Sequence, residues 1–219
     1  LIRYYLGLIS YKMENYSYAY NYIKPTYEDN RKKIGYNVLL GLALLKIGEF
    51  QEDQKIKNSG YNYLKRGSQY EGIRLTNSMI INEDNVEIRK NTKYMIRRVN
   101  MIDPEGVINF EFYHNILFDH YKEINRLSSL SVEYEKFILN DPDNKKYYEE
   151  LVKILNELEY YNTLSFLLKA YVTKFYKRGD KKTRKTYIRF TLLNAKADFK
   201  RGEILDCKVH LSTIGEEDL

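Results

Sequence analysis

The stretches YYLGLISYKMENYSYA, from Tyr4 to Ala19, and LLGLALLKIGEF, from Leu39 to Phe50, decide the fold. Their glycines, Gly7 and Gly41, stand 34 residues apart. In each stretch apolar residues recur at helical spacing until a short polar break, after which an aromatic residue precedes a second helix. A residue as small as glycine lets that second helix approach the first closely. The sequence therefore predicts two successive antiparallel helix pairs.

This period resembles the tetratricopeptide repeat (TPR), a two-helix unit of 34 residues. The family favours a small residue at position 8, here Gly7 and Gly41, and an aromatic residue at position 17, here Tyr16 and Phe50. The resemblance implies an all-α fold, a TPR-like superhelix of about six antiparallel helix pairs that is irregular in the middle. Such pairs stack because one pair alone cannot bury its apolar face.

The match to the repeat varies along the chain and predicts three regions: two regular TPR-like repeats at 1–67, an irregular helical pair at 68–110, and three degenerate TPR-like repeats at 111–219 with a basic insertion near 179–187. In the irregular region we expect helices near 69–81 and 86–101. Pro25 comes early in the first repeat, so we expect its second helix to bend or stop there. The sequence from Asn140 to Asn144 predicts a link between repeats.

Composition narrows the class of protein. The 219 residues include 43% hydrophobic and 30% charged residues and carry a net charge of +6. No apolar stretch approaches the roughly 18 residues of a membrane-spanning helix, and a single cysteine, Cys207, excludes a disulfide framework and a multi-cysteine zinc site. We expect a soluble protein, cytoplasmic or associated with a bacterial periplasm or envelope.

Catalytic motifs are missing from the sequence. His114 and His120 are six residues apart and so do not share a helix face for a metal ion. His210 lies three residues after Cys207 without further ligands nearby. The sequence contains neither a phosphate-binding glycine loop nor a nucleophile elbow. We therefore expect no enzyme, no metal site and no cofactor.

In the TPR family, positions 2, 5, 9, 12 and 13 of each unit face an inner groove, which suggests where a partner would bind. In the first two repeats this gives an apolar and aromatic groove: Tyr4, Leu8, Tyr11, Lys12, Val38, Leu42, Leu45 and Lys46. That surface is either a pocket for a partner helix or hydrophobic peptide or is covered by neighbouring helices. The repeats at 111–144 and 145–178 give a polar groove: Asn115, Asp119, Lys122, Lys153 and Asn156, with Glu123 and Glu157. The last repeat adds Arg189, Leu192, Lys196, Phe199 and Lys200.

The segment 174–189 concentrates the positive charge of the chain. Against one acidic residue, Asp180, it holds eight basic ones: Lys174, Lys177, Arg178, Lys181, Lys182, Arg184, Lys185 and Arg189. Such a cluster is either a solvated connection between repeats or an electrostatic footprint for nucleic acid, anionic lipid or an acidic partner.

These patterns favour a non-enzymatic scaffold or adaptor that binds a protein partner, as a helix or peptide, in its groove and so assembles or anchors a larger complex. The alternative is a factor associated with nucleic acid or an anionic membrane surface through residues 174–189. The identity of the partner is open.

Overall fold

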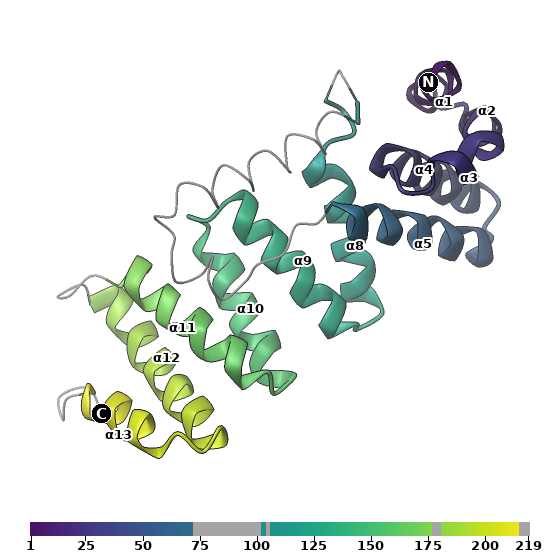
Figure 1. Cartoon of the computed structure of the whole chain (residues 1–219). Helices are drawn as coiled ribbons and strands as arrows, with labels where there is room; N and C mark the ends of the chain where they lie inside the picture. The colour runs from purple at the N-terminus through teal and green to yellow at the C-terminus, as the bar shows by residue number, and fades with distance from the viewer. Residues whose placement is uncertain (72–101, 104–105, 177–180, 215–219) are drawn as a thin grey trace. The chain divides into compact units, whose positions relative to one another are not determined.

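The computed structural model describes residues 1–71, 102–103, 106–176 and 181–214, except for the side chains of Lys181 and Lys182 (Figure 1). Its regular secondary structure is entirely helical over these residues, so the described chain is all-α. They form two compact units: an N-terminal unit of residues 1–71, 102–103 and 106–124, and a C-terminal unit of residues 125–176 and 181–214. The helix predicted at 86–101, and all but residues 69–71 of that predicted at 69–81, lie outside the described residues.

The N-terminal unit contains the two predicted helix pairs. Its helices are α1 (Ile2–Lys12), α2 (Tyr16–Ile23), α3 (Tyr27–Asn30), α4 (Ile34–Phe50), α5 (Gln54–Tyr70) and α8 (Phe110–Glu123). Helix α1 packs on α2, α2 on α4, and α4 on α5, while α8 contacts α5. Pro25 lies in a short 3₁₀ turn, Lys24–Thr26, directly after α2. The predicted stop at this proline is therefore confirmed.

Helix α4 is one turn longer than the 34-residue alignment predicts. Tyr16 opens the second helix of the first pair, but Phe50 ends the first helix of the second pair and its side chain is 90% exposed. The second helix instead begins after Asp53, whose carboxylate accepts hydrogen bonds from the backbone N–H groups of Lys55 and Ile56. An aspartate at this position caps a helix N-terminus. For the second stretch, the prediction that a short polar break precedes the aromatic residue is therefore wrong, because α4 is helical through Phe50.

The glycines of the two pairs lie where their helices come closest. A Cβ atom on Gly41 would stand 2.8 Å from side-chain atoms of Leu64 and 2.9 Å from the carbonyl oxygen of Gly60. A Cβ atom on Gly7 would stand 2.8 Å from the side chain of Ile23. A side chain at Gly41 would require the backbone of α5 to shift, and one at Gly7 would displace the side chain of Ile23. The predicted reason for a small residue is therefore confirmed.

Five of the connections between described helices share one backbone conformation. A residue with positive φ follows α1, α4, α8, α10 and α12: Glu14 (62°), Glu52 (53°), Asn125 (50°), Glu159 (57°) and Gly202 (80°). After four of these five turns, the next backbone N–H donates to a carbonyl five residues back, as Asn15 does to Ser10 and Tyr160 to Leu155. This bond satisfies a carbonyl that the end of a helix leaves without a partner.

The C-terminal unit is a row of helices in which each packs on the next (Figure 1). They are α9 (Leu127–Asn140), α10 (Lys145–Glu157), α11 (Tyr161–Phe175), α12 (Lys181–Lys200) and α13 (Ile204–Ser212). The predicted link at 140–144 separates α9 from α10. Residues 181–187 of the predicted insertion are helical and form the first two turns of α12. Fully buried leucines, including Leu151, Leu155 and Leu164, fix α10 against its neighbours.

Candidate partner-binding groove

The apolar groove residues predicted in the first two repeats are mostly interior. Tyr4, Leu8, Val38, Leu42 and Leu45 are each at most 8% exposed. Of the two alternatives for this surface, the structure agrees with the second, in which neighbouring parts of the chain cover it. These five side chains therefore belong to the core of the N-terminal unit and form no open groove in this structure.

Part of the cover comes from the segment that precedes α8. The hydroxyl of Tyr4 donates to the carbonyl oxygen of Ile102 at 2.8 Å, and Lys12 Nζ lies 2.7 Å from Asp103 Oδ1. The second carboxylate oxygen of Asp103 accepts from the backbone N–H groups of Val107 (3.2 Å) and Ile108 (3.1 Å). Burial, and next the nearby charge of Asp103, raise the pKa of Tyr4.

The other predicted groove residues of the N-terminal unit are partly or fully exposed. Lys46 pairs with Glu49 at 2.7 Å, and Tyr11 lies 5.4 Å from Tyr16 between ring centroids. Asn115, Asp119 and Lys122 are exposed on α8. No side-chain hydrogen bond ties Asn115 or Lys122 to the described residues, which leaves this face of α8 open.

An open groove lies in the C-terminal unit, between α10 and α12, with a volume of about 860 Å³. Its walls contain Val152, Lys153, Asn156 and Glu157 from α10 and Lys185, Ile188, Arg189, Leu192, Leu193 and Lys196 from α12. Residues three or four apart lie on one face of a helix, so each helix turns one such stripe toward the other. The structure thus brings together the groove residues predicted for adjacent repeats: Lys153, Asn156 and Glu157 with Arg189, Leu192 and Lys196.

The groove has apolar side chains along its length. Val152 is 1% exposed, and Ile188 and Leu193 are partly exposed. Leu192 is 43% exposed although it is a large aliphatic residue. A second apolar surface placed over Leu192 would remove it from water, which is the main source of free energy in most protein associations. The groove is therefore suited to an apolar side chain of a partner.

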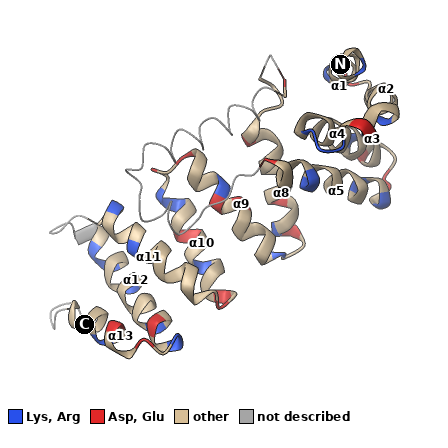
Figure 2. Ribbon diagram, in the orientation of Figure 1, with Lys and Arg blue, Asp and Glu red and all other residues tan. Residues whose placement is uncertain are grey.

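The charges around the groove are mainly positive. Four cationic side chains, those of Lys153, Lys185, Arg189 and Lys196, line it together with one carboxylate, that of Glu157. Figure 2 marks the Lys and Arg positions of the described ribbon in blue and the Asp and Glu positions in red. Lys196 Nζ donates to Asn156 Oδ1 at 3.2 Å, and Lys153 pairs with Glu150 on its own helix at 2.5 Å. Lys185 and Arg189 are exposed, and no side-chain hydrogen bond or ion pair links either to another described residue.

The basic segment 174–189 does not act as one surface over its described residues. Lys174 lies 3.2 Å from Asp143 and 5.7 Å from the ring of Phe175, so its charge already has partners. Lys177 and Arg178 lie outside the described residues, as do the side chains of Lys181 and Lys182. Arg184, Lys185 and Arg189 are exposed on α12, and the last two line the groove.

Two of the histidines have partners within the N-terminal unit. His114 Nε2 lies 2.9 Å from Glu71 Oε1, and neither side chain is exposed to solvent. His120 stacks on Tyr61, with ring centroids 3.6 Å apart and an angle of 7° between the planes. Both contacts join α8 to α5 or to the residue that follows it, so these histidines help to dock one helix on another.

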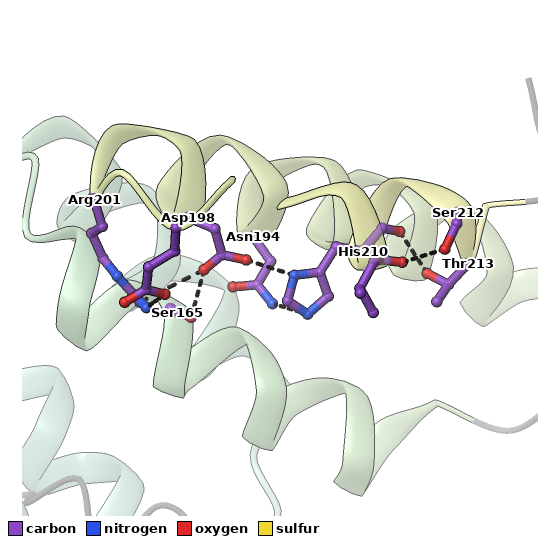
Figure 3. Close-up of polar contacts among 9 residues, drawn as sticks. Ser165, Asn194, Asp198, Arg201, His210, Ser212 and Thr213 are labelled. Atoms are coloured by element: carbon purple, nitrogen blue, oxygen red, sulfur yellow. Dashed lines mark hydrogen bonds and ion pairs between the residues drawn. The ribbon is translucent and has the colours of Figure 1, made fainter. Parts of the chain in front are cut away.

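A polar cluster around Asp198 holds the third histidine (Figure 3). Asp198 is fully buried, and its Oδ2 lies 2.6 Å from His210 Nδ1, while the other ring nitrogen lies 2.9 Å from Asn194 Nδ2. Ser165 Oγ donates to Asp198 Oδ1 at 3.5 Å, and Arg201 lies 3.7 Å from the same oxygen. The cluster joins α11, α12 and α13. The sequence analysis missed it, although Asn194, Asp198 and Arg201 have the spacing of a single helix face.

This cluster lacks the geometry of a nucleophile activated by a base. Ser165 and His210 both bond to the carboxylate of Asp198, through different oxygens, and not to each other. A catalytic serine needs its base within hydrogen-bond reach. The cluster therefore acts as a polar contact among three helices. No three His, Cys, Asp or Glu side chains among the described residues are placed to share a metal ion.

None of the described helices has both the length and the apolar character that crossing a membrane requires. No known protein family and no characterised protein matches the sequence.

Proposed function

We propose that this chain is a non-enzymatic scaffold or adaptor of TPR-like design, with about six stacked helix pairs, that binds a protein partner and so assembles or anchors a larger complex. The groove between α10 and α12 is its binding site. The observation that carries this proposal is that six of the ten residues lining the groove stand at positions that face the inner groove in TPR units: Lys153, Asn156, Glu157, Arg189, Leu192 and Lys196. Leu192 supports it further, because it is a large aliphatic side chain left partly exposed in that groove.

The chemistry of the groove favours an acidic segment with apolar side chains. Lys185 and Arg189, which have no ion-pair partner among the described residues, attract carboxylates, while Leu192 offers an apolar contact between them and Lys196. From Lys185 to Lys196 the helix rises about 16 Å, or three turns. An amphipathic helix or extended peptide of similar length would match this stripe.

Selection from a displayed peptide library, followed by affinity measurement in solution, tests the proposal. We expect peptides with acidic and bulky apolar residues to be enriched. The double variant Arg189→Glu, Leu192→Glu is expected to bind them at least about tenfold more weakly, because each lost interaction of about 1.4 kcal/mol changes affinity tenfold. The variant Lys169→Glu makes the same kind of charge change at an exposed site on α11 outside the groove and is expected to bind normally. Equal affinity of all three proteins would contradict the groove.

The alternative function, binding of nucleic acid or an anionic membrane surface, is supported by the exposed basic residues near the start of α12. Reversing Lys181, Lys182, Arg184 and Lys185 to glutamate tests this alternative. If the alternative holds, binding of RNA, DNA or anionic liposomes falls steeply with salt and is lost in this variant. Binding that survives the four reversals excludes a role for these residues.

A further inference from the structure

Contacts within the C-terminal unit show that α10 and α12 run in the same direction along the groove. Helix α11 lies antiparallel to α10, because the hydroxyl of Tyr171, late in α11, donates to Glu149 Oε1, early in α10, at 2.7 Å. The ring centroid of Tyr171 lies 4.5 Å from that of Phe190, while Ser165, early in α11, donates to Asp198, late in α12. The first turns of α10 and α12 therefore lie at one end of the groove and their last turns at the other.

The end formed by the first half of α12 carries positive charge without a counterion. Lys185 and Arg189 are four residues apart on a helix, so their side chains are neighbours on the face that lines the groove. Both are exposed, and neither forms a side-chain hydrogen bond or ion pair with another described residue. Like charges at this spacing repel each other and weaken a helix slightly. An acidic residue of a partner would relieve that repulsion.

The other end of the groove holds an acidic residue that has no ion-pair partner among the described residues. Glu157 is the last residue of α10, where a negative charge opposes the helix dipole. Its side chain is exposed and forms no hydrogen bond or ion pair within the described part of the chain. Lys196 donates to Asn156, the residue before Glu157, so this end carries one positive and one negative charge. A basic residue of a partner would pair with Glu157, whereas an acidic one would be repelled by it.

The remaining cation of the groove, Lys153, is already balanced by Glu150 on its own helix. The net charge of the groove therefore falls along its length, from the two cations at Lys185 and Arg189 to none near Glu157. A surface with unequal ends distinguishes between the two ends of what it binds, because complementary charges favour one alignment and like charges disfavour the other.

We propose that the groove binds its partner segment in one direction, with acidic residues against Lys185 and Arg189 and a lysine or arginine beside Glu157. An apolar side chain of the segment lies over Leu192 between them. The occupant is an amphipathic helix that is acidic at one end and basic at the other. This inference rests on the proposed function, because it specifies the segment that the groove between α10 and α12 binds.

Two synthetic peptides that differ in one residue test this charge order. Each is about twelve residues long, to match the roughly 16 Å from Lys185 to Lys196. Both have blocked ends without charge, two glutamates one turn apart near the first end, and a leucine in the middle. The last residue is lysine in one peptide and glutamate in the other. In titration calorimetry the unmodified chain is expected to bind the lysine peptide about fivefold more tightly, because an attraction to Glu157 replaces a repulsion.

The variant Glu157→Gln removes the carboxylate and keeps the size of the side chain, so it is expected to lose the preference for the lysine peptide. Asp206→Asn is the matched control, since Asp206 is exposed on α13 and outside the groove, and it is expected to keep the preference. Equal affinity of the unmodified chain for both peptides, or an unchanged preference in Glu157→Gln, overturns the charge order and leaves the groove as a binding site. Failure of both peptides to bind overturns the proposed function as well.

Nitroxide labels on the lysine peptide measure the direction of binding. A label at the glutamate end is expected to broaden the amide signals of Lys185 and Arg189 most strongly, and a label at the lysine end those of Glu157 and Lys196. Labels at both ends that broaden the same signals equally would show a segment bound in both directions, which contradicts the proposal.

Discussion

At the scale of single residues, Asp103 shows how one carboxylate joins distant parts of the chain. It lies 91 positions from Lys12, to which it is bound, and its side chain is not exposed. Its other oxygen accepts two backbone N–H bonds within the turn that leads to α8. Removing one partner of a buried ion pair leaves an uncompensated charge, which is far more costly than losing an exposed pair. Asp103 therefore fixes Val107 and Ile108, with its own backbone, against α1.

Buried tyrosines predict a loss of stability at alkaline pH. Burial, followed by the proximity of Tyr16 and Glu49, raises the pKa of Tyr11 from 10.0 to about 12. Burial, with Glu150 and Tyr147, raises the pKa of Tyr134 to about 12. Between pH 10 and pH 12 the unfolded chain has lost phenolic protons that the folded chain still holds. The contribution of these tyrosines is therefore complete below pH 10 and is lost as the pH rises toward 12.

Urea unfolding at a series of pH values measures this effect. We expect the free energy of unfolding to be steady just below pH 10 and to fall above it. Tyr11→Phe keeps the ring but has no ionisable group, so its fall over the same range should be shallower. A parallel fall in the variant and the unmodified chain would show that Tyr11 titrates alike in both states.

At the scale of elements, the sequence predicted the helices better than their ends. The 34-residue spacing found the α1–α2 and α4–α5 pairs, because close helix contact requires a small residue at Gly7 and Gly41. The same spacing misplaced the turn after α4, since Phe50 is aromatic without being part of a core. The better signal was Asp53, a capping residue directly before the second helix.

The contact between α4 and α5 predicts a strong effect of a single methyl group. Gly41→Ala places a Cβ atom against Leu64 and the backbone of Gly60, so the helices must separate. We expect the free energy of unfolding to fall by about 2 kcal/mol, as is typical when a packed core is overfilled. Asn62→Ala, on the exposed side of α5, serves as the control and should have little effect. Thermal unfolding of both variants and of the unmodified chain measures the difference in stability.

At the scale of the whole molecule, the division into two units predicts that damage to one unit stays local. His210→Ala removes a bond to the buried carboxylate of Asp198 and so a side-chain tie between α13 and α12. Amide hydrogen exchange should then quicken in α13 and in the adjoining part of α12. Gly41→Ala should instead quicken exchange in α4 and α5. Faster exchange throughout both units in either variant would show that they unfold together.

The candidate site was predictable in part. The resemblance to TPR units predicted that Lys153, Asn156, Arg189, Leu192 and Lys196 face a common groove, because a repeating fold gives residues at equivalent positions the same direction. The cover over the N-terminal groove was not predictable, since the bonds of Tyr4 and Lys12 to residues 102–103 span more than 90 positions. No local pattern contains that information. The Asp198 cluster likewise depends on side chains from three helices.

The turns with positive φ bear on which side chains the connections between helices can accept. Glutamate occupies three of the five turns, asparagine one and glycine one, yet the dihedral angle falls in the same region in all of them. What these five turns share is thus a backbone conformation, and four of them also share the same main-chain hydrogen bond. Main-chain bonds tolerate many side chains. The side chains at these turns can therefore differ widely while the backbone conformation that links one helix to the next stays the same.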